Sequence, residues 1–263
     1  MTAAIEETQS LWVKVSLTTV EQLHEVIHKY IETNHHEVIL HVNVNGMNLA
    51  YESGHLRRLF NEAPVVFCDG AGVALALRIL CGVHVPGRIT YADWTWQLAR
   101  FCESHRYSMF FLGGRPGVAE AAGARLRERF PGLRLVGCQH GYFDCEGSES
   151  QRVIDRINSL RPNVLLVGLG MPLQEEWLGS HHGDIRANVC LTGGAVFDFI
   201  SGRTRRGPRF LVDHSFEWFV RFCVEPRRLW RRYLIGNPLF LWRAWRWTRR
   251  SQAQPGGGGR GHL

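Results

Sequence analysis

Short apolar runs alternate with amphipathic stretches along most of this chain, and this alternation restricts its fold more than any other feature. The pattern is typical of a mostly parallel sheet covered by helices. Buried parallel strands are apolar throughout, whereas the helices between them are apolar on one face only. Strands are predicted at residues 37–43, 65–68, 108–112, 134–138, 163–168 and 187–192. Helices are predicted at 19–33, 46–60, 71–81, 93–106, 116–130, 149–160 and 172–180.

The sequence thus predicts an α/β fold with a mostly parallel, Rossmann-like sheet. In such sheets ligands bind beyond the carboxyl ends of the strands. Polar residues and glycines follow the predicted strands, namely Asn43, Asp69-Gly70, Gly113-Gly114, Gly141-Tyr142-Phe143, Gly170-Met171-Pro172 and Gly193-Gly194. Glycine lets main-chain N–H groups approach a ligand, and each following helix offers a positive N-terminus suited to phosphate. We therefore expect a ligand site at this edge of the sheet.

Beyond Gly202 the chain becomes strongly basic and aromatic. From Arg203 to Arg250 it holds 13 arginines and three acids, a local balance of +10, whereas the whole chain has a net charge of +7. Five of the nine tryptophans lie in this segment, at positions 218, 230, 242, 245 and 247. Arginine beside tryptophan is typical of a helix lying in a membrane interface, and a packed helical appendage with a solvated basic face is the alternative.

These composition changes divide the chain into three parts. Residues 1–202 are expected to form the α/β catalytic domain, 203–250 a basic, helical, membrane-associating appendage, and 251–263 a disordered tail. The seven cysteines form no C-x-x-C pair, so free thiols are expected instead of disulfides or a zinc cluster. The N-terminus has no signal-peptide pattern, and no apolar stretch reaches the roughly 18 residues of a membrane span. We expect a cytoplasmic protein peripherally associated with the inner face of the cell membrane.

Several familiar motifs are missing from the sequence. It has no G-K-[ST] of a P-loop and no G-x-S-x-G, and neither Gly70-x-Gly72 nor Gly168-x-Gly170 has the third glycine of the dinucleotide motif, which disfavours ATPases, serine hydrolases and dehydrogenases. His24-Glu25-Val26-Ile27-His28 does match the H-E-x-x-H zinc pattern. However, it lies on a predicted helix away from the ligand edge and lacks a third histidine at metzincin spacing. A solvent-facing N-terminal helix is therefore favoured over a metal site.

Asp69 is the strongest candidate for chemistry. It follows the buried run Val-Val-Phe-Cys and precedes glycines, so its carboxylate is expected to be partly desolvated and placed for proton abstraction. The alternative is a structural Asp that caps the helix predicted at 71–81. The local sequence favours neither role over the other.

Taken in order, several short motifs from about Val38 to Arg232 resemble the WecG/TagA/CpsF family of bacterial glycosyltransferases, glycosyltransferase family 26. No single motif is specific, but the ordered series is. It comprises Asn43, Asp69-Gly70, Arg88-x-x-x-x-Asp93, Leu112-Gly113-Gly114-x-Pro116, Gly141-Tyr142-Phe143, Gly170-x-Pro172-x-Gln174-Glu175, Gly193-Gly194-x-x-x-Asp198-x-x-x-Gly202, Arg206-x-Pro208, Glu217-Trp218-x-x-Arg221 and Pro226-x-Arg228.

The resemblance implies an inverting enzyme that moves a sugar, often N-acetylmannosamine, from a UDP donor to an undecaprenyl-diphosphate-linked sugar. Asp69 then matches the base. The substrate-binding residues that it implies are Asn43, Arg88, Asp93, Gly113, Gly114, Gln174, Glu175, Asp198, and the appendage arginines Arg221, Arg228 and Arg231. No D-x-D metal motif is present, so no metal and no other cofactor is expected, and helix N-termini with the C-terminal arginines would stabilise the leaving diphosphate.

The chain departs from the family pattern at two places. Asn45 and Asn48 add two amides near Asn43 that could contact the donor or the acceptor. Trp94 and Trp96 stand where smaller residues are expected, and either core packing or stacking on a sugar would explain them.

The arginine-aromatic segment also fits a protein that binds single-stranded nucleic acid, which is the main rival hypothesis. The resemblance favours a membrane surface and no nucleic acid as partner, and it leaves a homo-oligomer open.

Overall fold

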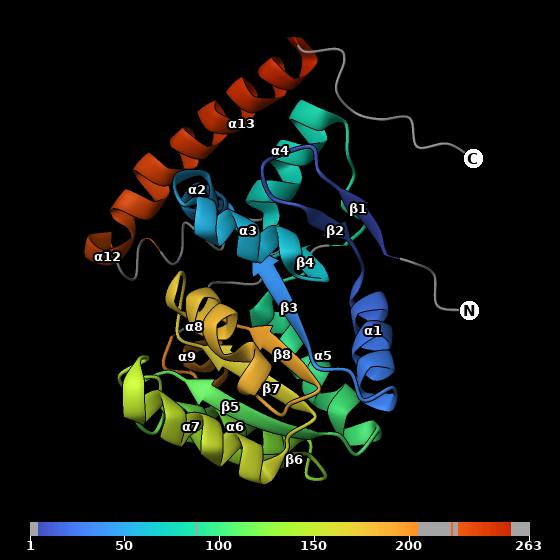
Figure 1. Cartoon of the computed structure of the whole chain (residues 1–263), viewed down its shortest axis with the longest axis vertical. Helices are drawn as coiled ribbons and strands as arrows, with labels where there is room; N and C mark the ends of the chain where they lie inside the picture. Colours follow the sequence, from blue (N-terminus) through green and yellow to red (C-terminus); the bar gives the residue numbers. More distant parts are fainter. Residues whose placement is uncertain (1–4, 88, 205–221, 223–225, 254–263) are drawn as a thin grey trace.

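A computed structural model describes residues 5–87, 89–204, 222 and 226–253. One eight-stranded sheet runs through the protein in the order β1-β2-β4-β3-β8-β7-β5-β6 (Figure 1). All neighbouring strands are parallel except β1 and β2. The strands are β1 (Glu6–Thr8), β2 (Val15–Leu17), β3 (Glu37–Val42), β4 (Val65–Cys68), β5 (Ser108–Gly113), β6 (Arg134–Gln139), β7 (Val164–Gly168) and β8 (Val189–Thr192). The predicted α/β class with a mostly parallel sheet is confirmed.

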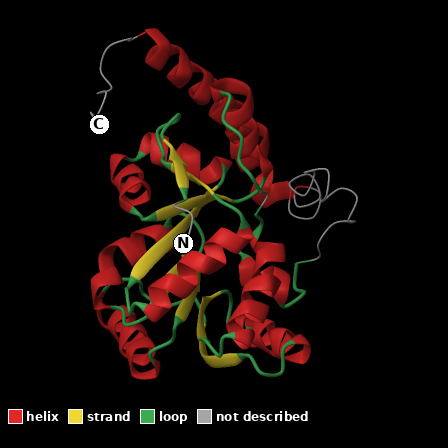
Figure 2. Cartoon of the chain, turned by 90° about the vertical axis from the view of Figure 1, so that its right-hand side faces the viewer, coloured by secondary structure: helices red, strands yellow, loops and turns green. Residues whose placement is uncertain are grey.

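Helices cover both faces of the sheet (Figure 2). Those of the main body are α1 (Val20–Glu32), α2 (Val44–Glu52), α3 (Gly54–Glu62), α4 (Ala71–Cys81), α5 (Tyr91–Ser104), α6 (Val118–Arg129), α7 (Gly147–Leu160), α8 (Leu173–His181) and α9 (Val196–Ile200). A 3₁₀ turn, η1 (His182–Asp184), follows α8. The central strands β4, β5, β7 and β8 are buried along their whole length, as expected for parallel strands covered on both faces.

The core has one large cluster on one face of the sheet and two smaller ones on the other. On the first face α1, α5, α6 and α9 contribute the large cluster, which includes Leu23, Leu98, Leu126 and Phe197. On the other face, one cluster lies under α2, α3 and α4 and a second under α7 and α8. The sheet is therefore held between two apolar layers, and its carboxyl edge remains for a ligand.

The single helix predicted at 46–60 is wrong, because the segment forms two helices that meet at Ser53. The Ser53 main chain is extended (φ −110°, ψ 113°), its N–H closes α2 on the carbonyl of Leu49, and its hydroxyl accepts a hydrogen bond from the N–H of Leu56. Serine favours such a cap because its oxygen satisfies a main-chain N–H that the first helical turn leaves open. The strands β1 and β2 were also missed, since three residues carry too little periodicity to predict a strand.

The described part of the C-terminal segment is a continuous helical rod, made of α12 (Pro226–Trp230), one π-helical turn η2 (Arg231–Ile235) and α13 (Gly236–Ala253). It lies along α2 and α4 at the top of Figure 1. Phe240 and Ala244 are buried in the same cluster as Trp12, whose ring contacts Phe240 and Trp247 edge-on. Arg243 binds Glu52 at 2.6 Å and lies over the ring of Tyr51. One face of the basic segment is therefore packed on the body.

Some predictions fall on residues that the structure does not describe. Residues 205–221 and 223–225 of the appendage, with Trp218, and residues 254–263 of the tail lie outside the described part. The six cysteines of the described part are all free thiols, as predicted, and three of them, Cys68, Cys102 and Cys190, are buried.

Candidate active site

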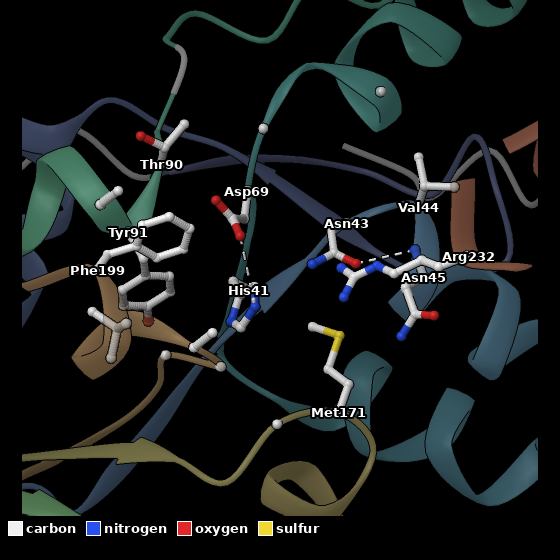
Figure 3. A pocket seen from close by; sticks show the side chains of 18 of the residues that line it. His41, Asn43, Val44, Asn45, Asp69, Thr90, Tyr91, Met171, Phe199 and Arg232 are labelled. Carbon is white, nitrogen blue, oxygen red and sulfur yellow. Dashed lines mark hydrogen bonds and ion pairs between the residues drawn. The ribbon is translucent and has the colours of Figure 1, made fainter. Parts of the chain in front are cut away.

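A cavity of about 350 Å³ opens at the carboxyl edge of β3 and β4. Its walls are the turns that follow these strands, the starts of α2, α4 and α5, the glycine loops after β7 and β8, and the turn η2 (Figure 3). The residues that line it are His41, Asn43, Val44, Asn45, Asp69, Gly70, Ala71, Gly72, Thr90, Tyr91, Ala92, Gly170, Met171, Gly193, Gly194, Ala195, Val196, Phe199, Arg232, Tyr233 and Asn237. The ligand site predicted at this edge of the sheet is present.

Asp69 lies in the wall of this cavity, held by its main chain on both sides. Its N–H donates to the carbonyl of Val42 at 3.0 Å, and the residue forms a parallel bridge with Ile89. Its side chain is 24% exposed, so the carboxylate is partly desolvated but within reach of a ligand. Helix α4 has Gly70 as its N-cap and no side-chain cap, so Asp69 does not serve as the cap that its sequence position suggested. The capping alternative is therefore wrong.

His41 lies next to this carboxylate at the end of β3. Its Nε2 is 3.9 Å from Oδ2 of Asp69, and its Nδ1 is 2.9 Å from the hydroxyl oxygen of Thr192 on β8. Burial lowers the pKa of His41, while the charge of Asp69 raises it and that of Arg232 lowers it further. Burial also raises the pKa of the neighbouring Cys68 thiol to about 12, so that group stays protonated.

Asn43 uses one half of its amide to begin a helix and leaves the other half for the cavity. Its Oδ1 accepts hydrogen bonds from the N–H groups of Asn45 and Gly46, which caps α2. Its Nδ2 points toward the middle of the cavity (Figure 3). Asn45 lines the cavity as well, whereas Asn48 faces the C-terminal rod and donates to the carbonyl of Gly236.

Positive charge enters the cavity from two sides. Arg232 of η2 lines the wall next to Asn43 (Figure 3). At another part of the wall, α4 begins at Ala71 with Gly70 as N-cap, so within the described part of the chain the first turn of this 11-residue helix has no side-chain cap. Gly70 has a φ of 86°, a conformation that side chains with a Cβ rarely adopt. An arginine and an open helix N-terminus together favour an anionic group such as a diphosphate.

Gln174 and Glu175 do not line the cavity but hold two of its loops. The Oε1 of Gln174 accepts from the N–H of Gly170 at 3.2 Å and from the N–H of Gly194 at 2.9 Å, which ties the loop after β7 to the loop after β8. Its Nε2 donates to Oε1 of Glu175 at 2.8 Å. Burial raises the pKa of Glu175 to about 8, so its carboxyl group is protonated at neutral pH.

The other predicted site residues lie around the cavity or outside the described part. Gly113 and Gly114 join the ends of β5 and β7, and a Cβ on Gly113 would collide with the carbonyl of Gly168. Asp93 is exposed at the start of α5 and accepts from the Thr90 hydroxyl, and Asp198 lies 3.8 Å from Arg203. Arg231 is exposed and stacks on Trp230, so the structure brings the adjacent Arg232, not Arg231, to the cavity. The positions of Arg88 and Arg221 and the side chain of Arg228 are outside the described residues.

Several lining residues were not among the predicted site residues. They are His41, Tyr91, Met171, Phe199, Arg232, Tyr233 and Asn237. His41 carries the only signal in the local sequence, since it is a polar residue inside an apolar strand two positions before Asn43. The others come from the loop after β7, from helices and from η2, and their positions relative to the cavity depend on packing.

Trp94 and the H-E-x-x-H motif meet in the core. Trp94 is 1% exposed, and its Nε1 donates to Nε2 of His24 at 3.1 Å, so the core-packing explanation of Trp94 is confirmed. Trp96 is half-buried against the same cluster. Burial lowers the pKa of His24 to about 4 and its ring stacks on Phe101, so this histidine packs inward instead of facing solvent. Among the described residues, no three His, Cys, Asp or Glu side chains gather as metal ligands.

Comparison with known proteins identifies the family of this chain. The sequence model of the glycosyl transferase WecG/TagA/CpsF family matches residues 8–254. This match covers nearly all of the 263 residues. The chain belongs to the WecG/TagA/CpsF family. It is accordingly a glycosyltransferase of the hexosyltransferase class, as the ordered motifs predicted.

Several named relatives are similar to the chain over most of its length. The N-acetylglucosaminyldiphosphoundecaprenol N-acetyl-beta-D-mannosaminyltransferases of Staphylococcus aureus strains NCTC 8325, COL and MW2 are each 27% identical to it over 231 residues, which is 86% of this chain and 87% of the relative.

In the described residues, no helix is both long enough and apolar enough to span a bilayer.

Proposed function

We propose that the protein transfers N-acetylmannosamine or a related hexose from a UDP-sugar to a sugar linked to undecaprenyl diphosphate, in the synthesis of a bacterial surface polysaccharide. The names of the relatives support both the sugar and the lipid-linked acceptor. The observation that carries the proposal is the pairing, in one cavity, of a partly exposed carboxylate with an arginine and an uncapped helix N-terminus.

This pairing fits a single displacement with inversion. Asp69 accepts the proton of the acceptor hydroxyl while that oxygen forms a bond to the anomeric carbon of the donor sugar. The bond between the anomeric carbon and the diphosphate oxygen breaks on the opposite face, and UDP leaves with the electron pair. Negative charge builds on the diphosphate, where Arg232 and the N-terminus of α4 stabilise it.

The first test is a screen of UDP-sugars against a polyprenyl-diphosphate N-acetylglucosamine acceptor, read by UDP release and by mass of the product. We expect UDP-N-acetylmannosamine to give the fastest release. Asp69→Asn is nearly isosteric and removes the base, so kcat should fall by about 10²–10⁴-fold. The matched control is Asp155→Asn, which changes an exposed aspartate on α7 and should leave kcat unchanged. Equal turnover by Asp69→Asn would refute the assignment of the base.

We also propose that the transfer needs no metal ion, because Arg232 and α4 supply the charge that a divalent cation would otherwise provide. UDP release should then be the same in EDTA as in magnesium. Arg232→Gln should instead lower kcat/KM for the donor, whereas the exposed neighbour Arg231→Gln should leave it nearly unchanged. A loss of activity in EDTA that magnesium restores would contradict metal independence.

We propose further that the outer face of the C-terminal rod rests on the inner face of the cell membrane, where the acceptor lipid is found. Leu241, Trp242 and Trp245 of α13 are about half exposed. The guanidinium groups of Arg246 and Arg249 lie over the rings of Trp242 and Trp245. Indole rings beside arginines suit the head-group layer of an anionic bilayer. Leu75 and Ile79 of the adjoining helix α4 add exposed apolar surface.

Liposome flotation tests the membrane contact. Vesicles with anionic phospholipid should float the protein, and Trp242→Ser with Trp245→Ser should reduce the floated fraction. Tyr142→Ser is the control, because Tyr142 is an aromatic residue even more exposed than the two tryptophans and follows β6, away from the rod. Undiminished flotation of the double tryptophan variant, or salt-sensitive binding of single-stranded oligonucleotide without flotation, would reject this surface as a membrane contact.

A further inference from the structure

One buried side chain next to Asp69 has no role in the transfer as described so far. His41 is 2% exposed, and its ring lies between β8 and the carboxylate. Nε2 faces Oδ2 of Asp69 at 3.9 Å, and Nδ1 lies 2.9 Å from Oγ1 of Thr192, a residue with no exposed surface. A buried polar ring with one nitrogen on a hydroxyl and the other facing a carboxylate is fixed in orientation.

The Thr192 hydroxyl decides which ring nitrogen carries the proton. Its oxygen accepts a hydrogen bond from the main-chain N–H of His41 at 3.3 Å, and this N–H can only donate. The hydroxyl has one proton of its own to donate, and Nδ1 of His41 is the acceptor within reach. Donation of that proton to Nδ1 would leave the hydrogen of the neutral ring on Nε2. The N–H of the ring consequently points at Asp69.

The surroundings keep the ring neutral and in place. The titratable and charged groups around it are Asp69 directly after β4, Tyr91 at the start of α5 and Arg232 of η2. The Tyr91 ring meets His41 edge-on at 5.0 Å, and Phe67 covers another side of the imidazole. Burial lowers the pKa of His41, and this favours the uncharged ring at neutral pH.

We propose that His41 is a positioning residue for Asp69. In the substrate complex, Nε2–H of His41 donates a hydrogen bond to Oδ2 of Asp69. Oδ1 of Asp69 then faces the hydroxyl of the acceptor sugar and accepts the proton of that hydroxyl. The imidazole of His41 keeps its Nε2 hydrogen throughout. Thr192 fixes the tautomer that makes this possible. The proposal rests on the proposed function, because it assigns Asp69 as the base of the transfer.

The tautomer can be measured without any turnover. Long-range ¹H–¹⁵N correlation spectra of ¹⁵N-histidine-labelled full-length protein separate the two neutral tautomers and the imidazolium, and the His41→Gln spectrum identifies the signals of His41. We expect a neutral ring with the hydrogen on Nε2 at pH 7. Thr192→Val should weaken that preference, whereas Thr192→Ser, which keeps the hydroxyl, should retain it. A hydrogen on Nδ1, or an imidazolium, would overturn the proposal.

Kinetics test the positioning itself. His41→Leu should lower kcat about tenfold to a hundredfold with little change in KM for the donor, because misplacement of the base affects the chemical step. His41→Gln, which can still donate an N–H, should recover part of that loss. In the Asp69→Asn background His41→Leu should cost nothing more, since the group that it positions is gone. An equal loss in both backgrounds, or a change in KM alone, would reject the role.

The two proposals fail in different ways. If no UDP-sugar is turned over by the wild-type protein, the proposed function is wrong, whereas the spectra still decide how His41 faces Asp69. Suppose instead that the wild-type protein is active and Asp69→Asn is much slower. If His41→Leu then lowers kcat by the same factor in both backgrounds, only the positioning role is wrong.

Discussion

Two amide side chains, Asn43 and Gln174, each accept two main-chain hydrogen bonds at the edge of the cavity. Asn43 begins α2, and Gln174 joins the loops after β7 and β8. Both tasks fix main-chain segments that a ligand would touch. At the residue scale, the amide side chains of this site therefore mainly fix the main chain around the cavity. Asp69 and Arg232 are the charged groups that line the same cavity.

Glu175 should make stability depend on pH. Its pKa is about 8 in the folded protein because of burial, against an ordinary value of 4.5. Between these two values the folded protein holds a proton that the unfolded chain has lost, so the free energy of unfolding falls as pH rises across this range, by roughly 3–5 kcal/mol. Glu175→Gln keeps the shape without the ionisation and should flatten this fall in urea titrations at pH 5, 6.5 and 8.

The control for this prediction is Glu128→Gln, which changes an exposed glutamate on α6 and should leave the pH dependence of the wild-type protein unchanged. A Glu175→Gln variant that loses stability from pH 5 to 8 as steeply as the wild type would contradict a buried, protonated Glu175.

At this scale the sequence was informative where a residue follows a strand. Asn43 and Asp69 were predicted because the ends of parallel strands meet at one edge, and the structure places both in the cavity. Arg232 was not predicted, since adjacent residues on a helical turn point in different directions and motif spacing cannot choose between Arg231 and Arg232. Tyr91 and Phe199 were missed because their place depends on contacts between distant segments.

At the scale of elements, a single hydroxyl separates two helices. The segment 46–60 has helical periodicity throughout, so a sequence pattern alone predicts one helix there. The structure breaks it at Ser53, whose extended main chain turns α3 away from α2 and lets each helix cover a different part of the sheet. The predicted strands that the structure contains lie within two residues of their predicted ends, because a buried apolar run has clear limits.

Removing that hydroxyl should be costly. Ser53→Ala leaves the N–H of Leu56 without its hydrogen-bond acceptor, and the free energy of unfolding should fall by about 1 kcal/mol. Ser159→Ala is the matched control, because Ser159 is an exposed serine within α7 and caps no helix N-terminus. Chemical denaturation of the three proteins compares them directly. If the two variants lost the same stability, the hydroxyl of Ser53 would not be what begins α3.

At the scale of the whole molecule, the segment before β2 packs against the C-terminal rod. Trp12 is buried, donates its Nε1–H to the carbonyl of Met47 at 2.7 Å and contacts Phe240 and Trp247. A division at residue 202 follows the composition, yet α13 shares a core cluster with α2 and α4. Composition could not predict this packing, because arginines and apolar residues occur on both the packed face and the outer face of α13.

The rod also carries Arg232 to the cavity, so loosening its packing should reduce activity at a distance. Phe240 is 1% exposed, and Phe240→Ala should cost about 3–5 kcal/mol and lower kcat/KM for the donor. Leu241→Ala, at a half-exposed neighbour, is the control and should change neither. A short-chain, water-soluble acceptor keeps membrane binding out of the measurement. Full activity in a destabilised Phe240→Ala protein would show that the rod and the cavity are not coupled.

The contact between Trp12 and Phe240 has a consequence for synthesis of the chain. A ribosome makes Trp12 early and Phe240 more than two hundred residues later, so the side of Trp12 that packs on the rod stays uncovered through most of translation. Arg232 is made in the same late stretch. A nascent chain can therefore assemble the sheet and Asp69 before it has the arginine of the site, and the enzyme gains its complete cavity only as its last helix emerges.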